Sequence, residues 1–228
     1  DAAQLDANGF RLGLRDRPTV LTGLGTALWQ TRSKRGQEAE GVEPRGGTWD
    51  FEDLTRRFGD LVVESRHVVV YRADEDGHHG GRPAETGLGA PTTLGAILAG
   101  LNRTLFLFKA QHRAVATLKR ELSLPRLLVP LQRTGPTLSL GGLSSSSPFH
   151  QHPENWFAQL HGRKAWVVAP QDYPAPRKLR SFHPCDLHFR ESVPVGVQRC
   201  ILQAGEVLYL PAQWHHGTCN AADFALGV

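Results

Sequence analysis

Three histidines in the second half of the chain have the spacing of a metal site. His150 and His152 are separated by one residue, and His216 follows within the segment Gly205-x5-Pro211-x4-His216-x3-Asn220. On a β-strand, side chains two positions apart point to the same face, and a histidine from a distant strand can complete a tripod. The sequence therefore predicts that these three imidazoles bind a divalent transition metal inside a β-barrel.

Two other readings bear on this metal site. An isolated histidine in such a place is usually a core residue, but three of them at this spacing favour a metal. Because consecutive strand positions face opposite ways, only one of His215 and His216 can point inward, and we assign His215 to the outside face. Glu154 follows His152 by two residues and could offer an oxygen ligand, yet we expect it to be solvated.

The elements that must position these residues are short strands that recur from residue 137 onward. Their recurrence predicts a mainly β fold, a double-stranded β-helix of the jelly-roll or cupin type. The segment 171–197, with four prolines and mixed charge, is interpreted as an insertion between two halves of the barrel. The expected strands are 137–140, 149–152, 156–160, 164–168, 199–202, 207–210, 215–219 and 224–228.

The first half of the chain has mixed α/β character. We expect a single domain over 1–228, with N-terminal α/β additions in 1–136 and the barrel core in 137–228. Hydrophobic spacing predicts a helix over 49–58 that Gly59 ends, and Thr92 or Thr93 can cap a second helix that runs to residue 101. Strands are expected at 19–23, 61–63, 68–71 and 105–108.

Composition excludes several classes of protein. The 228 residues are 40% hydrophobic and 21% charged, which is ordinary for a globular protein. No apolar run reaches the roughly 18 residues that a membrane span needs. The net charge is +4, but the basic residues are scattered and lack a base-stacking aromatic motif, so no nucleic-acid partner is expected. Since the chain begins with Asp1 and has no methionine, we expect a fragment or mature segment.

The cysteines and one short motif bear on the compartment. Cys185, Cys200 and Cys219 are too few for a disulfide scaffold and lack zinc-ribbon spacing. We expect small buried residues, and a single bridge stays open in an oxidising compartment. Asn102, in Asn-Arg-Thr, fits the N-glycosylation acceptor pattern, which also arises by chance.

Several of these segments together resemble a known family. Residues 149–152, 162–166 and 204–211, followed by 214–216, are similar to the jumonji-C domain of the cupin superfamily. Segments 17–24, 58–60 and 102–106, together with Arg199-Cys200, look like matching segments in the same order. The resemblance therefore covers nearly the whole chain, and it is densest from Pro148 to Asn220.

The resemblance implies an oxygenase that uses iron(II) and 2-oxoglutarate. His150 and His216 match the two histidine ligands of the family, whereas His152 stands where most members have Asp or Glu. Lys164 matches the lysine that binds the far carboxylate of 2-oxoglutarate, and Ser147 matches a threonine hydroxyl that supports it.

Further positions carry over as lining residues. Asn155 and Asn220 match amides that line the family site, and Phe106 lies where many relatives have a tyrosine. Simpler roles stand beside these assignments: Lys164 could extend to the barrel rim, Ser147 could cap a turn, and both asparagines are turn formers.

The histidine at position 152 leaves three hypotheses open. A carboxylate at this place brings a negative charge to the iron, and a neutral imidazole removes it. The chain is then an iron(II) and 2-oxoglutarate-dependent dioxygenase acting on a protein, an inactive scaffold or interaction module, or a cupin metalloenzyme that does not use 2-oxoglutarate. The resemblance implies the lumen of the endoplasmic reticulum, with the cytoplasm as the alternative.

Overall fold

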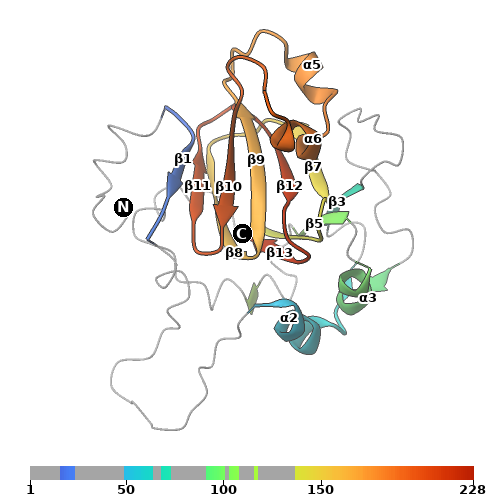
Figure 1. The fold of residues 1–228 in the computed structure, drawn as a ribbon. Coiled ribbons are helices and arrows are strands. Elements are labelled where there is room, and N and C mark those ends of the chain that lie inside the picture. The colour runs from blue at the N-terminus through green and yellow to red at the C-terminus, as the bar shows by residue number, and fades with distance from the viewer. Residues whose placement is uncertain are drawn as a thin grey trace, which may run out of the picture.

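The computed structural model describes residues 16–23, 49–63, 68–72, 91–100, 103–107, 116–117 and 137–228, with the backbone alone for 68–72 and 103–107. Within these residues the fold is mainly β, and two antiparallel sheets enclose an apolar core (Figure 1). The predicted β-barrel of the cupin type is therefore confirmed. None of the helices in the described ranges is long and apolar enough to cross a membrane.

The larger sheet has seven strands and the facing sheet has four, and all their pairings are antiparallel. The order in the larger sheet is β1 (Thr19–Leu21), β11 (Val207–Leu210), β8 (Asn155–His161), β13 (Ala225–Gly227), β6 (Leu138–Gly141), β5 (Arg103–Leu107) and β3 (Val68–Arg72). The order in the smaller sheet is β10 (Gln198–Gln203), β9 (Arg163–Ala169), β12 (His215–Asn220) and β7 (Ser146–His150). A separate pair joins β2 (Val62–Val63) to β4 (Thr92–Thr93).

The first half of the chain contributes strands to the barrel. β1 pairs with β11, and β5 connects β3 to β6, so the larger sheet combines both parts of the sequence. One expectation about the second half was wrong. β7 ends at His150 instead of residue 152, because its partner β12 begins at His215 and offers no further backbone to pair with.

Both helices predicted in the first half are present, and each begins at a capping side chain. Helix α2 (Phe51–Phe58) starts where the Asp50 carboxylate accepts a hydrogen bond from the Asp53 N–H at 2.7 Å, and Gly59 follows its last residue. Helix α3 (Leu94–Ala99) is capped by the Thr93 hydroxyl. The predicted helices are thus present, a few residues shorter than expected.

Two helices that the sequence did not predict lie in the connection from β9 to β10. They are α5 (Pro176–Arg180) and α6 (Pro184–Phe189), and each begins with a proline. Proline suits the first turn of a helix because that position needs no N–H donor. Both helices pack on the outer face of the smaller sheet (Figure 1). The residues that form this outer core are Phe149, Val167, Ala169, Leu179, Leu187 and Val197.

The inner core lies between the two sheets. It contains Phe157 from β8 and Trp166 from β9, whose ring centroids are 5.2 Å apart in an edge-on arrangement. Residues of β9 alternate between this inner core and the outer core, as a period of two requires. The remaining members of the inner core are Val168, Leu202, Leu208 and Leu210.

Candidate metal centre

The three predicted histidines meet at one end of the barrel. His150 and His216 are cross-strand partners with ring centroids 4.2 Å apart, and the His152 ring lies 4.5 Å from that of His216. One nitrogen from each ring lies within 4.8 Å of the other two. His216 is paired with Val168 of the inner core, so the cluster opens into the barrel. The geometry is that of a metal tripod.

Each imidazole is oriented by a backbone carbonyl. The Nδ1 atoms of His150, His152 and His216 lie 2.8, 2.7 and 2.9 Å from the carbonyl oxygens of Pro148, Pro153 and Trp214. A carbonyl can only accept, so each Nδ1 donates, and in the neutral ring the lone pair is then on Nε2. Such partners orient metal-binding histidines in proteins. Three Nε2 atoms arranged in this way suit a divalent transition metal such as zinc or iron.

Burial keeps two of these rings in the form that binds metal. Desolvation lowers the pKa of His150, and the neighbouring His152 lowers it further. The pKa of His216 falls well below its ordinary value because the ring is fully buried and faces two other imidazoles. Both rings are therefore neutral near pH 7, as metal coordination requires.

A bulge in β7 brings Ser147 onto the face that carries His150. His150 pairs with His216 and Ser147 pairs with Thr218, so two residues of β7 lie opposite one residue of β12. In a regular strand, a spacing of three residues would place Ser147 on the opposite face. Ser147 is 1% exposed, and within the described part of the chain its Oγ has no hydrogen-bond partner. The alternative role as a turn cap is therefore not seen among the described residues, and the hydroxyl faces the interior.

Lys164 lies inside the barrel rather than at its rim. Its side chain is 1% exposed, and Nζ donates a hydrogen bond to Ser139 Oγ of the facing sheet at 3.1 Å. The ammonium also lies 5.2 Å from the centre of the Phe157 ring. Burial lowers the pKa of Lys164 to about 7. A buried amine of this kind can bind a carboxylate through a charge-assisted hydrogen bond.

The two asparagines have different surroundings. Asn155 Nδ2 lies 3.4 Å from His152 Nε2, so this amide contacts the third histidine of the cluster. Asn220 Nδ2 donates to Ser145 Oγ at 2.8 Å, and its backbone N–H donates to the Ser145 carbonyl. A side chain at Gly141 would overlap the Asn220 amide. The contacts of Asn220 therefore support an architectural role at the end of β12.

Other candidates lie away from the cluster or outside the described residues. Glu154 Oε2 accepts a hydrogen bond from the Tyr209 hydroxyl at 3.0 Å, so it is not a fourth ligand. His215 is on the outer face as expected, but it is buried there, and burial together with the nearby Arg180 lowers its pKa. The side chain of Phe106 and the whole of Asn102 are not among the described residues.

Trp166 was not among the predicted site residues. It follows Lys164 by two positions on β9 and faces the same interior, where its ring centroid lies 5.9 Å from that of His216. Its indole N–H is buried, and none of the described residues offers it a hydrogen-bond acceptor. The sequence could have indicated this residue, because side chains alternate along a strand and positions 164 and 166 of β9 therefore share a face.

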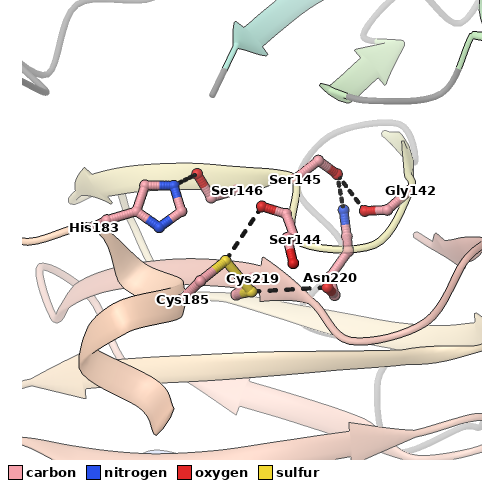
Figure 2. The surroundings of a disulfide bond; sticks show 8 residues. All are labelled: Gly142, Ser144, Ser145, Ser146, His183, Cys185, Cys219 and Asn220. Carbon is pink, nitrogen blue, oxygen red and sulfur yellow. Dashed lines mark hydrogen bonds between the residues drawn. A yellow bond between two sulfur atoms is a disulfide. The ribbon is translucent and has the colours of Figure 1, made fainter. Parts of the chain in front are cut away.

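A disulfide joins the insertion to the strand that carries His216. Figure 2 shows Cys185 of α6 bonded to Cys219 of β12. Nearby, Ser146 Oγ lies 2.9 Å from Nε2 of His183, directly before α6. Of the two readings left open by the sequence, a single bridge is thus the correct one. Cys200 is a free thiol, and burial raises its pKa to about 11.

Comparison with known proteins agrees with this architecture. A family model described as a cupin-like domain matches residues 109–226, just over half of the chain. JmjC domain-containing protein 8 of Homo sapiens is 34% identical over 141 residues, which cover 57% of this chain and 48% of that protein. The Mus musculus protein of the same name is 36% identical over 97 residues, 38% of this chain and 34% of its own length.

A third relative has a different name. Lysine-specific demethylase 8 of Xenopus tropicalis is 31% identical over 103 residues, which cover 39% of this chain and 23% of that protein. In each of these comparisons the matched region spans less than half of the relative.

Proposed function

Because the chain belongs to the cupin-like family of jumonji-C domains, we propose that it is a metal-binding jumonji-C domain of the iron(II) and 2-oxoglutarate-dependent oxygenase type. His150, His152 and His216 would hold the metal through their Nε2 atoms. The observation that carries this proposal is the set of three Nδ1 contacts to backbone carbonyls, which fixes every ring with its lone pair toward the cluster.

The interior of the barrel supports a dicarboxylate as the second ligand. Lys164 offers an ammonium group, and the Ser147 hydroxyl and the Trp166 N–H are buried without partners in the described chain. Buried polar groups without partners are uncommon, and a bound ligand would satisfy them. Iron(II) with 2-oxoglutarate would supply oxidation of a carbon–hydrogen bond by oxygen, coupled to decarboxylation to succinate. The protein would place the reactants and exclude water.

A protein side chain is the proposed substrate class. One relative is named as a demethylase specific for lysine, which supports a protein substrate for this chain as well. The side chains of Ser147, Trp166 and Lys164 lie inside the barrel, and their polar groups suit the small cosubstrate 2-oxoglutarate. The larger substrate would therefore approach from the end of the barrel where the three histidines lie.

One feature supports a second candidate, a cupin metalloenzyme or metal-stabilised scaffold without 2-oxoglutarate. The third ligand position holds His152, whose neutral imidazole leaves the metal more positive than a carboxylate would. Asn155 also contacts His152 Nε2, the atom that would bind the metal. One lone pair cannot serve both partners, so this ligand is the weakest of the three.

Metal analysis of the purified chain tests the proposal. We expect one divalent transition metal per chain in the wild type and a loss of that metal in His150→Ala and His216→Ala. His161→Ala is a matched control, because His161 lies at the far end of β8 and is not part of the cluster. An unchanged metal content in both cluster variants would refute the site. Calorimetry with 2-oxoglutarate and an inert metal then separates the oxygenase from the second candidate.

We further propose the lumen of the endoplasmic reticulum as the compartment. The Cys185–Cys219 disulfide supports this, because disulfides form and persist in oxidising compartments. The acceptor motif at Asn102 is in keeping with the same route.

A further inference from the structure

Gln151 lies between two of the metal-binding residues and points away from them. Its side chain is directed to the outer side of the barrel, where Nε2 lies 2.7 Å from the Gln213 carbonyl oxygen and 3.2 Å from His215 Nε2. Gln151 directly follows His150, and His215 directly precedes His216. Gln151 and His215, which are the outward-facing neighbours of His150 and His216, therefore contact each other although they are distant in the sequence.

The chemistry of these contacts fixes the amide. The Gln213 carbonyl can only accept, so the atom that faces it must be the NH₂ group of Gln151. The second N–H of that group is then directed at His215 Nε2, which accepts. A single amide thus bonds both to the β11–β12 loop and to the start of β12.

The segment that this amide holds lies outside the strand pairing of the smaller sheet. His152 lies beyond the end of β7 and is not part of any strand pairing. Its carbonyl accepts a hydrogen bond from the Gln213 N–H at 2.9 Å. The position of His152 relative to His216 therefore depends on the contacts between residues 151–152 and residues 213–215.

We propose that Gln151 is a positioning residue of the metal centre, which holds the segment of His150 and His152 against the segment of His216 from the outer side. This inference rests on the proposed metal site. Partners of this indirect kind change metal affinity by about 10-fold to 100-fold when they are removed. Gln151 contacts the neighbours of the ligands and not the ligands themselves, so the lower end, about 10-fold, is expected.

The test uses cobalt(II) as the probe on the full chain. Gln151→Leu should weaken cobalt binding about 10-fold and alter the visible absorption of the bound cobalt, which reports coordination geometry. Gln159→Leu is the matched control, because Gln159 also donates from Nε2 to a backbone carbonyl but lies on β8 away from the cluster. It should lower the melting temperature and leave cobalt affinity and spectrum unchanged.

The outcomes are distinct. If Gln151→Leu does not fold, Gln151→Glu keeps the size of the side chain, removes both N–H donors and should give the same loss. Wild-type affinity and spectrum in the folded variant would overturn the positioning role alone. Failure of the wild type to bind cobalt would overturn the metal site and the positioning role together.

Discussion

Cys219 and Asn220 are consecutive residues of β12 that face opposite sides of the same sheet. Cys219 points outward and is bonded to Cys185 of α6, whereas Asn220 points inward and donates a hydrogen bond to Ser145 Oγ. β12 also carries His216, four residues before Asn220. The strand is therefore fixed on both faces close to the metal-binding residue.

The outward attachment should contribute to stability. Replacing Cys185 and Cys219 together by alanine should lower the free energy of unfolding by about 4 kcal/mol, as expected for a closed loop of this size. The sequence separation of the two cysteines is 34 residues. Urea denaturation measures the difference, with Cys200→Ala as the control for loss of a thiol. Equal stability of the double variant and the wild type would mean that the bridge does not form in solution.

Binding of a carboxylate beside Lys164 should depend on pH. Burial lowers the pKa of Lys164 to about 7, and a bound carboxylate would raise it again because it favours the ammonium form. Below pH 7 the amine already carries its proton, so affinity for 2-oxoglutarate should be nearly constant. Above pH 7 binding must take up a proton, and affinity should fall by up to about 10-fold per pH unit.

Calorimetry in two buffers of different ionisation enthalpy measures that proton uptake. Lys164→Met keeps the length of the side chain and removes the amine. This variant should lose both the high affinity for 2-oxoglutarate and the dependence of that affinity on pH. An affinity that stays constant from pH 6 to pH 9 in the wild type would contradict a role for Lys164 in binding the carboxylate.

The neutral third ligand should limit oxygenase turnover. We expect weak or no succinate formation by the wild type with iron(II), 2-oxoglutarate and oxygen, because a carboxylate would make the metal easier to oxidise. His152→Asp and His152→Glu each restore the negative charge. Position 152 lies beyond the end of β7, and glutamate is tested because its longer side chain can reach the metal where aspartate is too short. Metal content is measured in all three proteins. Robust turnover by the wild type would show that the missing charge is not limiting.

The compartment can be tested through Asn102. In cells that express the full-length protein, glycosidase treatment should increase its electrophoretic mobility, and Asn102→Gln should abolish that change. Thr104→Ala removes the same acceptor motif without altering the asparagine and serves as the matched variant. An unshifted protein in the cytosol would argue against the secretory route.

The second half of the fold was predictable because its strands alternate and are separated by clear turn residues. Positive φ values at Gly162 and Gly205 mark two of these turns. The helices α5 and α6 were missed because Pro176 and Pro184, which begin them, were interpreted as signs of irregular structure. Sequence spacing alone carries no information on which prolines start a helix.

The candidate site was predictable in part. The histidine spacing identified the cluster, but the end of β7 could not be placed, since it depends on where the partner strand begins. The interior position of Lys164 follows from its contact with Ser139, which is 25 residues away in the chain and in the other sheet. Long-range pairings of this kind decide burial, and a local pattern does not contain them.

The bulge in β7 gives an odd spacing the result that a regular strand gives with an even one. With two residues opposite one, Ser147 and His150 share a face. Deleting Pro148 would give a regular strand in which the serine and the histidine are two positions apart, and they would still share a face opposite Thr218 and His216. In comparisons among relatives, a gap of one residue at this point is therefore not a sign of lost metal binding.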